Sequence, residues 1–351
     1  MQGARAWRTI PAMTTNRRVL LRSRPVGEPK PTDFEIADAP MPTPADGEIL
    51  VRTIWLSLDP YMRGRMNDVK SYSAPVELGG VMTAGTVGEV VESRHPGFRS
   101  GDFVLSYGGW QTHHIARAGA QPGPFGPLKL DPTQAPISTA LGVLGMPGMT
   151  AYVGLYDIGQ PKAGETVVVS GAAGAVGQTV GQLARIKGCR VVGIAGGADK
   201  GAWLTDELGF DAAVDYKSTD FKRELRAALP GGIDVFFDNV GGDVFEACLF
   251  AMNNFGRIAC CGAVSQYDGE PPRHGPRGIP GLIVTKRLTL RGFVVMDFAD
   301  QNDKALADLQ AWVASGQIKV QEDIIEGLEN LPNALIGLLA GENRGKRMVR
   351  V

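Results

Sequence analysis

The sequence predicts an α/β protein in which a doubly wound parallel sheet interrupts a second, β-rich domain. Three observations lead to this prediction. Residues 16–130 hold short β-like runs cut by Pro and Gly, residues 166–315 alternate strand-like and helix-like segments, and residues 316–351 return to short strands. Alternation of strands and helices is typical of parallel sheets, whereas short punctuated strands are typical of antiparallel ones. A domain inserted within another accounts for all three.

The composition is ordinary apart from its glycine content. The 351 residues include 44% apolar and 21% charged residues, and the formal net charge of −1 argues against a nucleic-acid partner. The 47 glycines are about twice the usual share of roughly 7%, which predicts many turns and close backbone approaches to a ligand. No apolar run reaches the ~18 residues of a membrane span. A small-molecule enzyme without membrane spans fits this composition.

The cysteines and the first residues bear on location. The four cysteines lie after residue 188, two of them adjacent, which fits neither a disulfide framework nor a Cys-x-x-Cys metal site. We therefore expect a reducing cytoplasm. Residues 1–15 are expected to be a disordered start, with Met13 as an alternative first residue. An Arg-rich, acid-free beginning is also a feature of transit peptides, and that reading stays open.

The β-rich domain is predicted from four runs with alternating apolar positions. These runs are "RRVLLRS", "GEILVRTIWLSL", "TAGTVGEVVES" and "DFVLSYGGW". A turn at Gly101 and Asp102 precedes the last of them. We expect an antiparallel, barrel-like arrangement.

The inserted domain begins with "TVVVSG" (166–171), a buried strand. It is followed by the helix "AVGQTVGQLARIKG", which has Val176, Val180 and Leu183 at helical spacing and ends at Gly188. The strands "RVVGIAG", "DAAVDY", "IDVFFDNVG", "GRIACCGAV" and "LTLRGFVVM" come next, with helices such as "DFKRELRAAL" and "DVFEACLFAM" between them. This spacing predicts βαβ units in a doubly wound sheet.

A glycine loop joins the first of these strands to its helix. Gly171, Gly174 and Gly177 form G-x-x-G-x-x-G, with Ala172 and Ala173 between them. Small residues let backbone N–H groups approach a pyrophosphate, and the start of the helix adds its dipole. The alternative is a tight turn with no ligand, but the βαβ frame favours a dinucleotide site.

The end of the second strand indicates which dinucleotide. An NAD site usually carries an acidic residue there, whereas this strand ends at Ala195 and continues with Gly196 and Gly197. The small residues leave room for a 2′-phosphate, and Lys200 would supply the countercharge. A solvated lysine at a helix start is the alternative, and Asp199 is expected to cap that helix. NADPH is the predicted cofactor.

Several motifs in this order resemble the zinc-independent medium-chain dehydrogenase/reductases, in particular the alkenal double-bond reductases and prostaglandin reductases. The motifs are "LSLDPYMRGRM", "LGMPGMTAYVGL", "GAAGAVG", "FDNVGG", "CGAVSQY", "RGFVV" and "GENRGK". The resemblance implies a GroES-like catalytic domain at 16–143 and 316–351, a Rossmann NADP-binding domain at 144–315, and a homodimer.

The resemblance also implies a set of cofactor residues. The glycine loop, with Gly174 to Gly177, falls at the pyrophosphate, Lys200 and Tyr216 fall at the adenosine phosphate, and "CGAVSQY" passes the nicotinamide ribose. The full set is Gly171, Gly174, Ala175, Val176, Gly177, Lys200, Tyr216, Asn239, Cys261, Gly262, Ser265, Tyr267, Phe293, Val294, Val295 and Asn343. Two alternatives stay open. Asn239 could belong only to a turn, and the segment from Phe293 to Val295 could be only a core strand.

No metal is expected. Zinc-dependent members need an early Cys ligand, a His-Glu pair and a four-cysteine lobe. This chain has no cysteine before Cys189, and "DPYMR" occupies the region of the first ligand. His113 and His114 are expected on a surface loop.

The remaining chemistry is hydride transfer to a conjugated acceptor, with negative charge collecting on a carbonyl oxygen. Tyr267 and a cofactor ribose hydroxyl are the candidate donors to that oxygen. The candidate residues for lining the acceptor pocket are Tyr61, Met62, Arg63, Tyr107, Met146 and Met149; ordinary core packing is the alternative for each. The predicted activity is NADPH-dependent reduction of the C=C bond of α,β-unsaturated ketones or aldehydes. A quinone reductase and a non-catalytic NADPH-binding protein remain alternatives.

Overall fold

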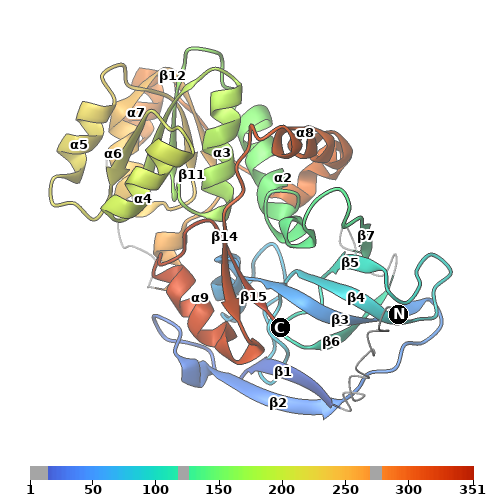
Figure 1. Ribbon diagram of the computed structural model, residues 1–351. Coiled ribbons are helices and arrows are strands. Elements are labelled where there is room, and N and C mark those ends of the chain that lie inside the picture. Colours follow the sequence, from blue (N-terminus) through green and yellow to red (C-terminus); the bar gives the residue numbers. More distant parts are fainter. Residues whose placement is uncertain (1–14, 118–125, 269–278) are drawn as a thin grey trace, which may run out of the picture.

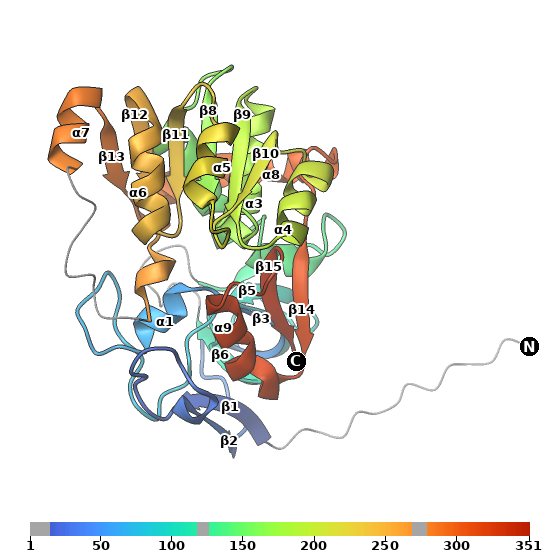
Figure 2. The same ribbon diagram turned by 90° about the vertical axis from the view of Figure 1, so that its left-hand side faces the viewer.

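The computed structural model describes residues 15–117, 126–268 and 279–351, which form two lobes (Figures 1 and 2). The expected disordered start lies outside the described residues except for Thr15, which already begins strand β1. None of the described helices has the length and apolar character needed to cross a membrane.

One lobe contains a six-stranded sheet in which every neighbouring pair is parallel. The strand order is β10-β9-β8-β11-β12-β13. Its strands are β8 (Thr166–Ser170), β9 (Arg190–Ala195), β10 (Ala212–Asp215), β11 (Ile233–Asp238), β12 (Met252–Cys260) and β13 (Thr289–Gly292). The helices of this lobe are α2 (Met146–Val153), α3 (Ala175–Ile186), α4 (Ala198–Ala202), α5 (Phe221–Ala228), α6 (Gly242–Ala251), α7 (Ile279–Lys286) and α8 (Asn302–Ala314). The doubly wound order β9-β8-β11 confirms the predicted fold class.

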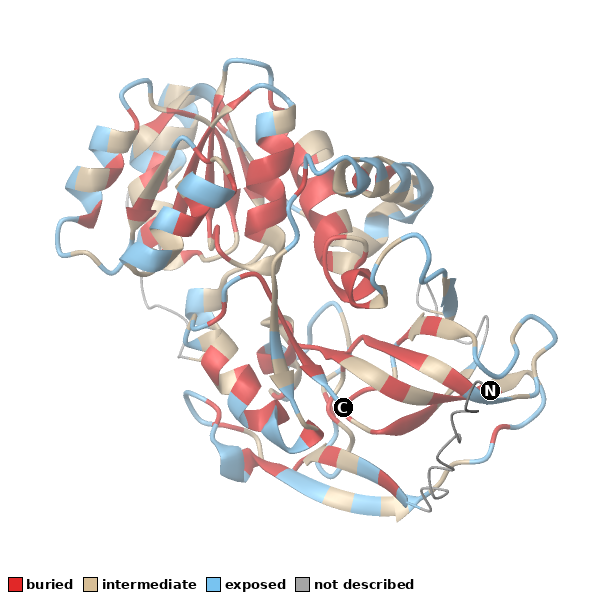
Figure 3. Ribbon diagram, viewed as in Figure 1, coloured by how far each residue is buried: buried red, intermediate tan, exposed pale blue. Residues whose placement is uncertain are grey.

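The sheet is covered on both faces because the interiors of its central strands are apolar. Val167 and Val169 of β8 pack with α2, α3 and α8, whereas Val168 packs with α5 and α6. Successive side chains of a strand point to opposite faces, so a continuous apolar run requires two layers of helices. Figure 3 shows central strands of this sheet and the helices α2 and α3 as largely buried.

The other lobe is built from antiparallel strands on both sides of the insertion. Its main sheet has the order β14-β15-β3-β4-β5-β7, with β6 paired to β3, and β1 pairs with β2 separately. The elements are β1 (Thr15–Leu21), β2 (Phe34–Pro40), β3 (Glu48–Ser57), α1 (Tyr61–Arg65), β4 (Thr86–Ser93), β5 (Phe103–Ser106), β6 (His113–Arg117), β7 (Leu128–Leu130), β14 (Glu322–Glu326), α9 (Leu331–Leu339) and β15 (Lys346–Arg350). Only β14 and β15 pair in parallel.

Three local expectations need correction. His113 and His114 do not lie on a surface loop, because they belong to β6 and are buried, and His114 Nε2 lies 2.8 Å from the Ser106 hydroxyl. Asp199 does not cap α4, whose preceding residue is Gly197 and which has no side-chain cap. The strand expected through "LTLRGFVVM" ends at Gly292, and the chain then turns into a 3₁₀ segment.

The returning chain ties the two lobes together. Gly345, just before β15, donates from its N–H to Ala173 O at 2.8 Å and pairs with Gly174 of the glycine loop. On α3, the amide groups of Gln178 and Gln182 donate to the carbonyls of Gln321 and Lys319. The carboxyl edge of the parallel sheet therefore faces the β-rich lobe.

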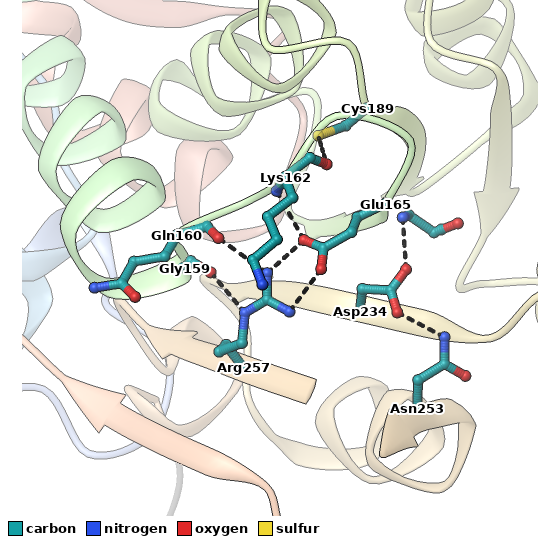
Figure 4. Close-up of polar contacts among 9 residues, drawn as sticks. Gly159, Gln160, Lys162, Glu165, Cys189, Asp234, Asn253 and Arg257 are labelled. Atoms are coloured by element: carbon teal, nitrogen blue, oxygen red, sulfur yellow. Dashed lines mark hydrogen bonds and ion pairs between the residues drawn. The ribbon is translucent and has the colours of Figure 1, made fainter. Parts of the chain in front are cut away.

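A polar cluster closes the opposite, amino-terminal edge of the parallel sheet (Figure 4). Arg257 of β12 binds both carboxylate oxygens of Glu165 and donates to the carbonyls of Gly159 and Gln160. Asp234 accepts hydrogen bonds from Thr166 N–H and from Asn253. These contacts fasten the starts of three strands, far from the edge that faces the other lobe.

We predict that Arg257→Met reduces stability without touching the site. The substitution leaves a partly buried carboxylate and two carbonyls without their donor, so the free energy of unfolding should fall by about 1–3 kcal/mol. Denaturant titration of the variant and the unmodified protein measures the change. An unchanged midpoint would show that the cluster contributes nothing to stability.

Candidate active site

The glycine loop lies where β8 meets α3, at the carboxyl edge of the parallel sheet. A Cβ atom at Gly177 would lie 2.3 Å from Gly171 O, so only glycine allows the first turn of the helix to pack on the strand end. Ala175 and Val176 are the first residues of α3, and no side chain caps this end at Gly174. The uncapped N–H groups of a helix start form an anion site. The loop therefore fits the pyrophosphate of a dinucleotide.

The end of β9 is open and positively charged. A Cβ atom at Gly196 would lie 2.9 Å from Lys217 Cε and 2.9 Å from Tyr216 Cε1, and Gly197 has a φ of +91°. Lys200 donates to Gly341 O at 2.5 Å, and the Lys217 ammonium lies 5.9 Å from the Tyr216 ring centre. Burial lowers the pKa of Lys200, and the charge of Lys217 lowers it further. A second positive charge near Lys200 favours a bound anion at this place, which fits a 2′-phosphate.

The end of β11 is held by hydrogen bonds to the end of β8. Asp238 accepts from Ser170 Oγ at 2.6 Å and from the N–H groups of Val240 and Gly241. Asn239 donates from its side-chain nitrogen to Ser170 O at 2.7 Å. The Asn239 side chain thus locks the two strand ends together, and its backbone borders the glycine loop near Gly171.

The segment after β12 folds back over its own strand end. Burial raises the pKa of Cys261 to about 12, so this thiol stays protonated. The Ser265 hydroxyl donates to Val240 O at 2.6 Å. The Tyr267 oxygen lies 3.5 Å from Ala263 N and beside Gly262. Tyr267 therefore lies over the end of a parallel strand, the edge where such sheets bind ligands.

The remaining predicted cofactor residues lie in two separate segments. The Phe293 ring packs against Phe237 at a centroid distance of 6.2 Å, and Val295 also packs on the core, with Val294 between them. Asn343 is buried and donates to Gly345 O at 2.8 Å, so its side chain shapes the turn that contacts the glycine loop.

A small pocket in the β-rich lobe gathers part of the predicted acceptor site. It is lined by Ser57, Asp59, Tyr61, Gly85, Leu105, Tyr107, Ala140, Leu141, Met146 and Pro147. Three of the six predicted residues, Tyr61, Tyr107 and Met146, are therefore brought together here. Met149 instead packs on the core of the parallel-sheet lobe.

The structure does not bring Met62 or Arg63 to this pocket. Met62 is fully buried in the core of the β-rich lobe. Arg63 is also buried, and its guanidinium donates to Asp268 at 2.9 Å and to Gly27 O at 2.8 Å. On a short helix, adjacent residues point in different directions, so only part of "YMR" can face one pocket. Arg63 instead fastens the residue that follows Tyr267 to α1.

Tyrosines occur both in the pocket and after β12. Burial raises the pKa of Tyr61 and of Tyr107, and the charge of Asp59 raises both further. Burial also raises the pKa of Tyr267, and Tyr72 is among the neighbours that add to this shift. The guanidinium of Arg65 lies 5.7 Å from the Tyr61 ring centre and 5.1 Å from the Tyr72 ring centre. All of these phenols are neutral donors at physiological pH.

Sequence reasoning missed several residues of this region. Lys217, Tyr72, Asp268 and the buried pair of Asp59 and Lys346 were not singled out. Lys217 directly follows the predicted Tyr216, and Asp59 stands inside the quoted "LSLDPYMRGRM", so adjacency to a motif was the available signal. Lys346 is likewise the last residue of the quoted "GENRGK". Tyr72 lies in none of the quoted motifs, so no sequence signal pointed to it.

Metal ligands are not assembled in the part of the chain that the structure describes. No three His, Cys, Asp or Glu side chains gather there as a metal ion would require. Burial lowers the pKa of His114 to about 4, and its ring contacts the hydroxyls of Ser106 and Thr53.

Comparisons with known proteins agree with this architecture. Residues 17–122 match the family model described as the N-terminal domain of oxidoreductase, and residues 175–311 match the model named zinc-binding dehydrogenase. The second name covers a larger group, which includes members that bind zinc.

Two curated relatives and one solved structure are similar over almost their whole length. The chain is 49% identical to the NADPH-dependent curcumin reductase of Escherichia coli, over 96% of this chain and 97% of the relative. It is 44% identical to prostaglandin reductase 1 of Bos taurus, over 94% and 97%. The crystal structure of CurA from Vibrio vulnificus in complex with NADPH superposes with a TM-score of 0.91 at 45% identity, covering 95% of this chain and 99% of the other. With this fold, these strand-end motifs and these relatives, the chain belongs to the zinc-independent medium-chain dehydrogenase/reductases, the family of the alkenal double-bond reductases and prostaglandin reductases.

Proposed function

We propose that the protein is an NADPH-dependent oxidoreductase that reduces the C=C bond of α,β-unsaturated ketones and aldehydes. The observation that carries the proposal is the uncapped glycine loop at the carboxyl edge of the parallel sheet, with Tyr267 over the end of β12 at the same edge. The facing lobe adds a pocket lined by Tyr61, Tyr107 and Met146. Relatives named as NADPH-dependent and prostaglandin reductases support the cofactor and the class of acceptor. Soluble, cytoplasmic action on small hydrophobic conjugated carbonyls is part of the proposal.

The residues of the chain divide the work between binding and charge stabilisation. NADPH, when bound, supplies the hydride. We assign the pyrophosphate to the loop from Gly171 to Gly177 and the 2′-phosphate to Lys200, Tyr216 and Lys217. The remaining wall of the cofactor site is assigned to residues after β11, β12 and β13 and in the turn before β15. These residues are Asn239, Cys261, Gly262, Ser265, Phe293 to Val295 and Asn343. Their hydrogen bonds keep the strand ends in place.

Tyr267 is proposed to stabilise the charge that develops on the acceptor oxygen. When hydride reaches Cβ of a conjugated carbonyl, negative charge moves to the oxygen as an enolate, and Cα then takes a proton. A phenol whose pKa is raised by burial keeps its proton and can donate a hydrogen bond to that oxygen. Tyr61, Tyr107 and Met146 then enclose the apolar part of the acceptor.

We further propose a homodimer formed through β13. This strand is the last in the parallel sheet, and Thr289, Arg291 and Gly292 on it are exposed. An unpaired edge can bind a second copy of the same strand about a two-fold axis, which would join two sheets.

The activity is tested by following NADPH oxidation with a panel of enones, enals, quinones and simple alcohols. Turnover of enones and enals is expected. Turnover of quinones alone would select the quinone reductase, and cofactor binding without any turnover would select a non-catalytic role.

Cofactor preference should depend on the two lysines beyond β9. kcat/KM should favour NADPH over NADH by at least about tenfold, because charged phosphate contacts contribute a few kcal/mol. The variants Lys200→Ala and Lys217→Ala should each lower this ratio. The cause should be a lower kcat/KM for NADPH, with the kcat/KM for NADH little changed. Lys222→Ala, an exposed lysine on α5, is the matched control and should not change it. Equal use of both cofactors by the unmodified protein contradicts the assignment.

Tyr267→Phe should lower kcat by roughly tenfold or more while NADPH binding stays nearly unchanged, since a positioned donor of this kind contributes a few kcal/mol in the transition state. Tyr156→Phe removes a phenol that donates to Leu183 O inside the cofactor lobe, and serves as the control. Steady-state kinetics and cofactor titration measure the two quantities. Normal kcat with weakened NADPH binding would reassign Tyr267 to cofactor binding.

Gly292→Glu should convert the dimer to a monomer. Nothing lies within 4 Å of a Cβ atom at Gly292, so one chain accommodates the side chain, whereas two copies would bring like charges together at the edge. Gly231→Glu, at an equally open position, is the control. Light scattering at micromolar concentration gives the mass, and a monomeric unmodified protein rules the dimer out.

A further inference from the structure

A buried ion pair lies behind the acceptor pocket, at the start of β15. Lys346 Nζ lies 2.5 Å from Asp59 Oδ1, and the two side chains are only 2% and 8% exposed. Removing two charges from water is costly, and a buried pair is often no more stabilising than apolar residues of the same size. Stability alone is therefore a weak reason for such a pair at this place.

One end of the pair belongs to the pocket. Asp59 lines the pocket and accepts a hydrogen bond from Ser57, while Lys346 also donates to Leu58 O at 2.8 Å. The ammonium thereby fixes Leu58 and Asp59, the two residues that follow β3, and Asp59 in turn holds Ser57 at the end of β3. The chain then enters α1 and Tyr61 after Pro60. The position of the pocket wall depends on Lys346.

The other end leads to the glycine loop. Gly345, the residue before Lys346, donates to Ala173 O at 2.8 Å and pairs with Gly174. Lys346 itself donates from its backbone N–H to Gln321 O at 3.0 Å. A single peptide bond thus separates the contact with the loop from the residue that holds the pocket wall.

We propose that the Lys346–Asp59 pair is a positioning element that holds the wall of the acceptor pocket at a fixed place relative to the cofactor loop. The inference rests on the proposed function, because it concerns how that same site is assembled. Lys346 is the positioning residue and acts through Asp59. Loss of the pair lets the wall move relative to the loop, so it weakens acceptor binding and orientation but leaves the loop's own contacts with the cofactor intact.

Binding is tested with the double variant Asp59→Asn/Lys346→Met. Removing both charges avoids the lone buried charge that Lys346→Met alone would leave, so the double variant is the one expected to fold. Isothermal titration measures the binding of NADPH, and the binding of a saturated ketone product with and without NADP⁺. In the unmodified protein, NADP⁺ should tighten ketone binding at least about fivefold. In the double variant, NADP⁺ should tighten ketone binding by less than about twofold.

Kinetics add a second readout. The KM of the double variant for an enone should rise about tenfold and its kcat should fall, while its Kd for NADPH changes by less than threefold. A purely structural role would lower the amount of folded protein and leave both constants unchanged. Arg257→Met is the matched control, since it breaks an ion pair at the far edge of the sheet and should not alter the enone KM.

The outcomes separate this inference from the proposed function. If the unmodified protein reduces no enone, the proposed function fails. If it reduces enones but NADP⁺ does not strengthen ketone binding, or if the folded double variant keeps a normal enone KM and normal kcat, the positioning role is wrong and the proposed function stands. The effect of NADP⁺ on ketone binding is measured on the unmodified protein alone. A missing effect therefore overturns the positioning role even if the double variant does not fold.

Discussion

The contact between the returning chain and the glycine loop is the constraint on which the site depends. Gly345 pairs with Gly174, and this contact joins residues 171 positions apart in sequence at the point where the dinucleotide loop begins. The amides of Gln178 and Gln182 extend the connection along α3. Through these contacts the β-rich lobe is attached at the carboxyl edge of the parallel sheet rather than against a face covered by helices.

Several charged side chains around the site are held by hydrogen bonds or ion pairs within the chain. Asp238 is satisfied by Ser170 and by backbone N–H groups, and Arg63 is satisfied by Asp268. Lys200 differs, because burial and then the neighbouring charge of Lys217 lower its pKa, and its ammonium donates to a carbonyl rather than to a carboxylate. Paired charges hold the framework, whereas a site of repelling like charges is suited to an anion from outside.

The absence of an acidic residue after β9 has a steric reason as well as an electrostatic one. Any side chain at Gly196 would collide with Tyr216 and Lys217, and the φ of Gly197 disfavours other residues. An acidic side chain at the first of these positions would therefore require the Tyr216 and Lys217 side chains to move.

The sequence by itself determined the fold class, the glycine loop and the order of strands and helices, because these depend on local periodicity and on residues close together in the chain. It placed β8 and α3 well, since a run of three valines favours a buried strand and Gly188 marks the end of a helix, which the structure ends at Ile186. Only the tertiary structure decided that Arg63 binds Asp268, that His114 is buried, and that Lys346 reaches Asp59. These contacts join segments distant in sequence or depend on which side of an element faces inward, and no local pattern records that direction.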